Sequence, residues 1–268
     1  MSPTLFSLFI NDLAIKLKEL HCGIKIANDN VSILLYADDI VLLSDSEDKL
    51  QIMLKHLNCW CIQWSLSINI LKSSIVHFRP KSTPKSQFNF VCGTQQLCTV
   101  KKYTYLGVTL DEHLSFLSCI ESLLLSGNRA LSSLINRYNV YRNFTYDIYV
   151  QLYDCSVIPT MLYGAEIWGF IETNHVLKIQ NRALRFFMGV HNKTPIPAMM
   201  GDMGWTDIYI KQSVCMIRFW NRMISMDYSR LTKRIFLWDY NLENKIWNAS
   251  VLKILSSVNC KHMYLIIC

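Results

Sequence analysis

Two adjacent carboxylates, Asp38 and Asp39, interrupt an otherwise apolar stretch at residues 33–43. Two short apolar runs around a polar pair are typical of a β-hairpin whose turn carries the polar residues. We therefore expect a buried hairpin with both aspartates at its tip. Burial of an ionised carboxylate without a partner is costly, and neighbouring carboxylates also repel each other. The sequence has no lysine or arginine between residues 31 and 48 that could neutralise them.

Two explanations of this carboxylate pair stay open at this point. A divalent metal ion would remove the electrostatic cost, because Mg²⁺ prefers carboxylate oxygens together with substrate phosphates. Two such ions about 3.5–4 Å apart form the clamp that enzymes use for nucleotidyl transfer. The other explanation is a solvated turn, because aspartate is a common turn residue. The pair alone does not decide between a metal site and a turn.

The first 112 residues combine helix and strand patterns. Apolar residues at helical spacing predict helices over 4–20 and 46–64, the second with Trp64 on its apolar face. Ser44 or Ser46 can cap this second helix. Short apolar or aromatic runs predict strands at 24–26, 75–78, 88–91 and 103–108. We expect a short antiparallel sheet that the two helices cover.

From Leu114 onward the sequence shows almost only helix signals. Breaks at Asn, Pro and Gly separate four candidate helices, at 114–138, 144–158, 173–188 and 206–226. The fold class is therefore expected to be α+β. An α+β part over residues 1–112 should be followed by a helical part over 113–190 and a C-terminal helical region over 191–268.

The composition excludes several classes of protein. Hydrophobic residues make up 51% of the chain and charged residues 18%, which excludes a disordered tail. Apolar runs are broken by charge well short of the ~20 residues that a membrane-spanning helix needs, so no membrane partner is expected. The 10 cysteines form no Cys-x-x-Cys pair, Cys260, His262 and Cys268 match no standard zinc spacing, and no signal peptide opens the chain. We expect reduced cysteines in a nuclear or cytoplasmic protein that is not secreted.

Positive charge is in excess, with 27 lysines and arginines against 20 acidic residues and a net charge of +7. Such a balance favours anionic partners. Cations in the helical half are interleaved with aromatic residues, and phosphate backbones bind such cations with release of counterions. The alternative is solvated helix faces, because long cationic side chains are usually exposed. The cations are Arg129, Arg137, Arg142, Lys178, Arg182, Arg185, Lys193, Arg218, Arg222, Lys233 and Arg234.

Several sequence blocks resemble reverse transcriptases. Tyr36-Ala37-Asp38-Asp39 between apolar strands resembles their catalytic hairpin, and residues 2–13, 60–73 and 103–108 resemble neighbouring blocks in matching order. Residues 163–190 resemble the thumb-side region of polymerases from non-LTR (LINE-type, jockey-like) retrotransposons. The resemblance covers residues 2–205 and implies a partial polymerase palm over 1–112, a helical thumb over 113–190 and a C-terminal helical region.

The resemblance implies roles for four residues around the hairpin. Asp38 would ligate the catalytic metals, Mg²⁺ or Mn²⁺, with two ions in the intact family enzyme, and Asp39 would be a weaker or conditional ligand. Tyr36 would pack near the primer terminus. Lys72 would lie near the leaving pyrophosphate as a proton donor, and its alternative is a solvated lysine after a turn. Asn69 is expected to order that turn.

The resemblance also implies a primer grip formed by Tyr105, Leu106 and Gly107. The structural alternative for these residues is an ordinary edge strand with a glycine bend.

The implied reaction joins a primer 3′-hydroxyl to the α-phosphate of a deoxynucleotide, with RNA as the template and DNA as the primer. The family also needs an aspartate upstream of the residues that match 2–13, and neither Asp12 nor Asp29 substitutes for it. We therefore expect this chain alone not to polymerise. Two alternatives stay open: a catalytically dead nucleic-acid-binding module, and a relic of a retroelement without a role.

Overall fold

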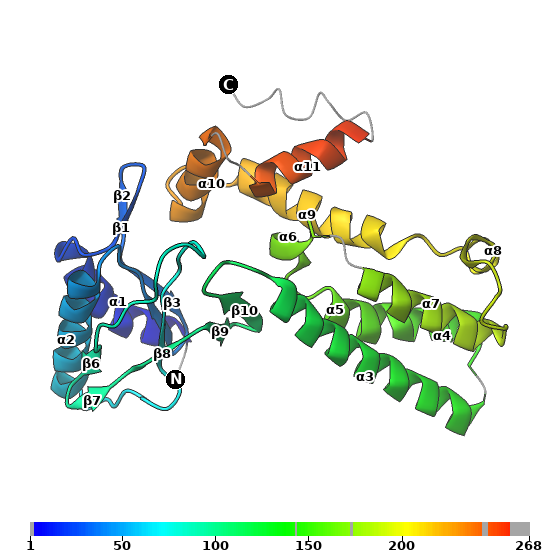
Figure 1. The fold of residues 1–268 in the computed structure, drawn as a ribbon, viewed down its shortest axis with the longest axis horizontal. Helices are drawn as coiled ribbons and strands as arrows, with labels where there is room; N and C mark the ends of the chain where they lie inside the picture. The colour runs from blue at the N-terminus through cyan, green and yellow to red at the C-terminus, as the bar shows by residue number, and fades with distance from the viewer. Residues whose placement is uncertain (1–2, 143, 172–173, 243–245, 258–268) are drawn as a thin grey trace. The chain divides into compact units, whose positions relative to one another are not determined.

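The computed structural model describes residues 3–142, 144–171, 174–242 and 246–257 (Figure 1). Cys260, His262 and Cys268, which the sequence excluded as zinc ligands, lie outside the described residues. The chain divides into two compact units, which are treated separately below. The first unit comprises Met1–Tyr103 and Asp111–Leu114, and the second comprises Thr104–Leu110 and Ser115–Cys268. The assignment of 1–112, 113–190 and 191–268 to palm, thumb and C-terminal region stays a prediction.

Two helices form the core of the first unit, α1 (Pro3–Glu19) and α2 (Glu47–Gln63). Ser46 caps α2 by accepting a hydrogen bond from the amide of Lys49, which confirms the expected cap. The two helices pack through a cluster of buried apolar side chains, which includes Leu13, Leu17, Met53, Leu57 and Trp60.

Trp60, and not the expected Trp64, lies on the buried face of α2. Trp60 is 3% exposed and Trp64 is 45% exposed, because the helix ends at Gln63 and Trp64 follows it. The Trp60 Nε1 donates to Asp12 Oδ2 at 2.9 Å and ties α2 to α1. This bond, together with one from Lys16, lowers the pKa of Asp12. Asp12 therefore has a structural role that the sequence analysis did not predict.

The strands form five two-stranded sheets among the described residues, so the expectation of one antiparallel sheet is wrong. Four of these sheets are hairpins of consecutive strands joined by short loops, and no third strand extends any of them among the described residues. Strand β5 pairs in parallel with β8, and residues 77–97 form the long crossover connection that a parallel pair needs. The strands are β1 (Ile24–Ile26), β2 (Asp29–Val31), β3 (Ile33–Tyr36), β4 (Asp39–Leu42), β5 (Ser74–Val76), β6 (Val91–Cys92), β7 (Gln95–Gln96), β8 (Cys98–Val100), β9 (Lys102–Tyr105) and β10 (Val108–Asp111).

The second unit is helical apart from strand residues around the β9–β10 turn, and the α+β fold class is confirmed. The expected helix over 144–158 is an α-helix that continues through a π-helical turn, Tyr153–Val157. None of the described helices has the length and apolar character to cross a membrane. The helices are α3 (Leu117–Tyr141), α4 (Tyr146–Leu152), α5 (Ile158–Met161), α6 (Ala165–Trp168), α7 (Asn174–Met188), α8 (Ile196–Asp202), α9 (Ile208–Ser225), α10 (Leu231–Asn241) and α11 (Ile246–Ser257).

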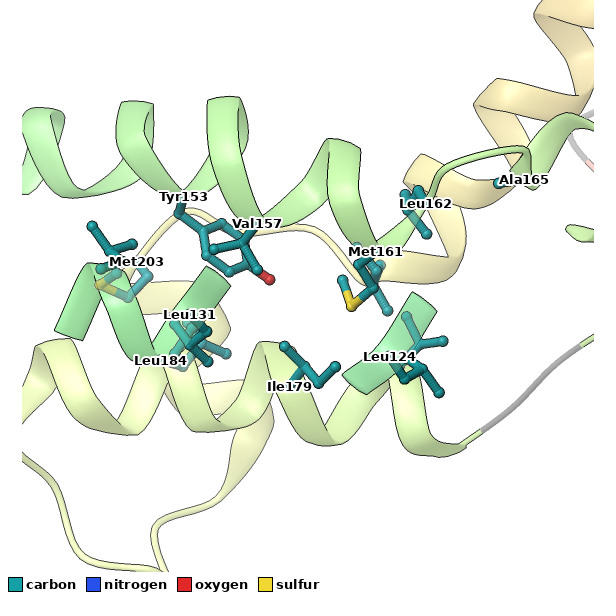
Figure 2. Close-up of a cluster of buried hydrophobic side chains, with 14 of the residues drawn as sticks. Leu124, Leu131, Tyr153, Val157, Met161, Leu162, Ala165, Ile179, Leu184 and Met203 are labelled. Carbon is teal, nitrogen blue, oxygen red and sulfur yellow. The ribbon is translucent and has the colours of Figure 1, made fainter. Parts of the chain in front are cut away.

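A large apolar cluster holds α3, α5 and α7 together. Figure 2 shows Leu131 of α3 beside Leu184 of α7, with Tyr153 and Val157 of the π-helical turn close to them. All four side chains are at most 1% exposed. A second cluster joins α9, α10 and α11, with Trp220 at 0% exposure. The sequence analysis gave no individual bounds for α6, α8, α10 and α11, although the last three lie in the C-terminal helical region that it expected over 191–268.

Candidate functional site

The β3–β4 hairpin carries the carboxylate pair at its tip. Tyr36 pairs with Asp39 across the ladder, and Ala37 and Asp38 form a two-residue loop. Ala37 has a φ of 50°. A positive φ at the first loop residue matches a type II′ turn, which favours glycine there. The alanine is therefore strained, and strained backbone of this kind often occurs at functional sites.

The hairpin is only partly buried, which corrects the expectation from sequence. Ile33 at its base is 7% exposed and joins the α1–α2 core, whereas Leu34 is 38% and Tyr36 is 62% exposed. Asp38 and Asp39 are both exposed at the tip. Water can therefore solvate both carboxylates, and the electrostatic argument from burial does not apply to them.

The hairpin carboxylates have no partner among the described residues. Neither Asp38 nor Asp39 forms a side-chain hydrogen bond or an ion pair there. Their oxygens are hard ligands of the kind that Mg²⁺ and Mn²⁺ prefer, so the pair fits such ions. The described residues include no group of three or more His, Cys, Asp or Glu that could hold a metal. The pair would thus supply part of a coordination sphere, with water and substrate phosphates as further ligands.

Lys72 lies in an exposed turn after α2. Its amide donates to the Asn69 carbonyl at 3.1 Å and to Asn69 Oδ1 at 3.2 Å, so Asn69 orders the turn as expected. The Lys72 carbonyl accepts a hydrogen bond from the Tyr103 hydroxyl at 2.8 Å. No ion pair joins Lys72 to the hairpin carboxylates among the described residues. Its role as a proton donor stays a prediction.

The β9–β10 turn contains Tyr105, Leu106 and Gly107, and it belongs to the second unit. Residues 103–108 were expected to be a strand, but Leu106 and Gly107 form a two-residue hairpin loop with φ values of 47° and 80°. Two successive positive φ angles match a type I′ turn. The turn is held by Tyr163, whose hydroxyl donates to the Leu106 carbonyl at 2.9 Å. Tyr163 lies in the block 163–190 that resembles the thumb-side region, but the sequence analysis assigned no role to this tyrosine.

A cation-rich surface crosses α3 and α7, and we call it the α3–α7 basic surface: Arg129, Arg137, Lys178, Arg182 and Arg185. The Arg182 guanidinium spans the two helices, donating to Asn128 Oδ1 and to Ser132 Oγ, both at 3.1 Å. Two shallow depressions lie on this surface, and neither is lined by an acidic residue. This arrangement suits a polyanion such as a phosphate backbone.

Comparison with known proteins places the hairpin in a matched segment. Residues 1–110 match the family model described as reverse transcriptase (RNA-dependent DNA polymerase). The chain is 29% identical over 188 residues to the RNA-directed DNA polymerase from mobile element jockey of Drosophila funebris, covering 67% of this chain and 20% of that protein. The jockey polymerase of Drosophila melanogaster is 28% identical over 204 residues, covering 70% and 21%. A transposon-derived protein of Caenorhabditis elegans is 30% identical over 146 residues, covering 53% and 50%.

The chain therefore spans about one fifth of the two jockey polymerases and half of the nematode protein. The range matched by the family model contains the blocks at 2–13, 36–39, 60–73 and 103–108 that resemble reverse transcriptases.

Proposed function

We propose that this chain forms a metal-binding and primer-binding part of a retrotransposon RNA-directed DNA polymerase, because residues 1–110 match the reverse transcriptase family model and the chain is similar to two jockey polymerases. Enzymes of this family use divalent metal ions, nucleic-acid templates and nucleotide substrates. The observation that carries the proposal is the exposed carboxylate pair at the tip of a hairpin within the matched segment, which has no partner in the part of the chain that the structure describes. The proposed partners are an RNA template, a DNA primer and deoxynucleotides.

The proposed chemistry is nucleotidyl transfer. The primer 3′-oxygen forms a bond to the α-phosphorus of the nucleotide, the bond from that phosphorus to the bridging oxygen breaks, and pyrophosphate leaves. Asp38 would hold Mg²⁺ or Mn²⁺, with Asp39 as the weaker ligand. Bound divalent ions would activate the primer hydroxyl and stabilise the charge on the pyrophosphate. Tyr36, which is exposed beside the pair, would contact the primer terminus, and Lys72 would donate a proton to the leaving group.

Replacing Asp38 with asparagine is expected to weaken Mn²⁺ binding by about tenfold or more, because a charged oxygen ligand is lost from a site with few protein ligands. Electron paramagnetic resonance can follow the Mn²⁺ titration in the presence of a primed RNA and a deoxynucleotide. Asp45→Asn is the matched control, since Asp45 is exposed in the same unit but is paired with Lys49 at 2.8 Å. Equal Mn²⁺ binding by both variants would contradict the proposed metal site.

Primer extension on the same primed RNA tests the chemistry directly. The sequence-based expectation is that this chain alone incorporates no deoxynucleotide in Mg²⁺. Incorporation that Asp38→Asn abolishes would overturn this expectation and support the proposed function. Incorporation that survives Asp38→Asn would count against the assignment of the hairpin as the metal site.

A second candidate function is nucleic-acid binding without chemistry. The observation that favours it is the α3–α7 basic surface, which carries five cations and no acidic lining residue in either depression. Such a surface binds duplexes through their phosphates whether or not the carboxylate pair holds a metal.

Neutralising two cations of this surface, in the double variant Arg129→Gln/Arg137→Gln, is expected to flatten the salt dependence of duplex binding. Each lost phosphate contact lowers the slope of log K against log salt by about 0.7–0.9, so two contacts lower it by between about 1 and 2. Fluorescence anisotropy of a labelled RNA–DNA duplex at several salt concentrations measures this slope. The control is Arg218→Gln/Arg222→Gln, which removes equal charge from exposed positions on α9. Equal losses in the two variants would show a general charge effect and no defined surface.

A further inference from the structure

An exposed leucine occupies a strained position in the β9–β10 turn. Leu106 has a φ of 47° and is 37% exposed. Type I′ turns favour asparagine or glycine at this place, because a larger side chain crowds the following carbonyl. The leucine gains little burial in return. A strained residue on the surface points to a contact that the isolated chain does not make.

Tyr163 braces this turn from α5–α6 of the same unit. Its hydroxyl donates to the Leu106 carbonyl at 2.9 Å, and its ring lies against Gly107. A Cβ added at Gly107 would lie 2.8 Å from Tyr163 Cε1, closer than real contacts. Gly107 is thus required both by its φ of 80° and by the tyrosine ring.

Tyr163 is itself anchored in the core of the second unit. Its carbonyl accepts a hydrogen bond from Trp168 Nε1 at 2.9 Å, and Trp168 is fully buried. The next residue, Gly164, has a φ of 68°, and a Cβ there would lie 3.2 Å from Val108 Cγ2. A continuous set of contacts therefore runs from the core, through Trp168 and Tyr163, to the turn.

We infer that Tyr163 is a positioning residue, which holds the Leu106–Gly107 turn in the geometry that the primer strand contacts; this inference rests on the proposed primer-binding function. The Tyr163 hydroxyl donates to the Leu106 carbonyl, and the exposed leucine side chain is free to contact a ligand. The Tyr163 ring is 51% exposed, so its hydroxyl contributes less to global stability than to the local order of the turn.

Hydrogen exchange of the free chain tests the brace without any nucleic acid. Tyr163→Phe is expected to speed exchange over residues 105–110 about fivefold and to leave α3 unchanged, because one hydrogen bond is lost at the turn alone. Tyr146→Phe is the matched control: Tyr146 is 41% exposed, and its hydroxyl donates to the Met203 carbonyl in the same unit. Adding Leu106→Gly to Tyr163→Phe should restore slow exchange, because glycine adopts the turn without strain. Equal exchange rates over residues 105–110 in wild type and in Tyr163→Phe would show that the Tyr163 hydroxyl does not brace the turn.

Duplex discrimination tests the positioning role. The ratio of affinities for an RNA–DNA duplex with a recessed primer 3′-end and for a blunt duplex of equal length reports contact with the primer terminus. We expect this ratio to exceed one in wild type and in Tyr146→Phe, and to fall at least threefold in Tyr163→Phe. Faster exchange with an unchanged ratio would overturn the positioning role and leave a structural brace. A wild-type ratio of one would instead contradict the proposed primer-binding function. The hydrogen-exchange result would still show whether Tyr163 braces the turn, because it is measured without nucleic acid.

Discussion

Replacing Trp168 with alanine is expected to lower the free energy of unfolding of the second unit by about 3–5 kcal/mol. Trp168 is 0% exposed and belongs to the large apolar cluster between α3 and α7. The change creates a cavity that the packed helices cannot fill, and it also removes the hydrogen bond to the Tyr163 carbonyl. Hydrogen exchange of buried α3 amides in increasing urea measures the loss for this unit alone.

Two variants control for this prediction. Trp238→Ala removes the same side chain from a position in the second unit that is 37% exposed, and its loss should stay below about 1 kcal/mol. Trp168→Phe keeps most of the volume and removes the N–H donor, so its loss should lie between those of the two alanine variants. Similar losses in Trp168→Ala and Trp238→Ala would show that the buried indole does not organise the core.

Replacing Glu112 with alanine is expected to destabilise the first unit by about 3 kcal/mol, because it leaves a buried guanidinium without its counter-charge. Arg79 Nη2 lies 3.1 Å from Glu112 Oε2, and the two side chains are 12% and 8% exposed. The Arg79 Nε has no hydrogen-bond partner among the residues that the structure describes, and its Nη1 donates to the Thr83 carbonyl. The pair joins the segment after β5 to the end of β10, so its loss should open that part of the unit.

Thiol labelling measures the Glu112→Ala effect within the first unit. Cys61 and Cys92 are buried there, and burial raises the pKa of both thiols, so they react slowly until the unit opens. Asp45→Ala is the control, because its exposed pair with Lys49 is worth at most about 1 kcal/mol. Equal labelling rates in the two variants would show that the Arg79–Glu112 pair contributes no more than a surface ion pair.

Much of the fold follows from local patterns. The helices over 4–20 and 46–64 were predicted within one residue at each end, and the aspartate hairpin was predicted from two apolar runs and a polar pair. The resemblance of ordered blocks to reverse transcriptases is supported by the family model that matches residues 1–110 and by the similarity to two jockey polymerases. The roles of individual site residues stay predictions.

The prediction from sequence was wrong where one pattern of residues was compatible with two different local structures. The run at 103–108 is apolar enough for one strand, but the positive φ angles of Leu106 and Gly107 turn it into a hairpin. Trp64 has the helical spacing of a buried residue, but it lies just past the end of α2. The hairpin was expected to be buried, with a solvated turn left open for its carboxylates, and both carboxylates are exposed at the tip.

The sequence by itself determined the α+β order, the helix periods, the hairpin that carries Asp38 and Asp39, and the resemblance to reverse transcriptases, because each of these depends on residues close together in the chain. Only the tertiary structure decided which distant residues support the site. Tyr163 reaches Leu106 across 57 positions, Trp60 reaches Asp12 across 48, and Arg79 reaches Glu112 across 33. Such contacts depend on how helices and turns pack in three dimensions, and a linear pattern carries no record of that packing.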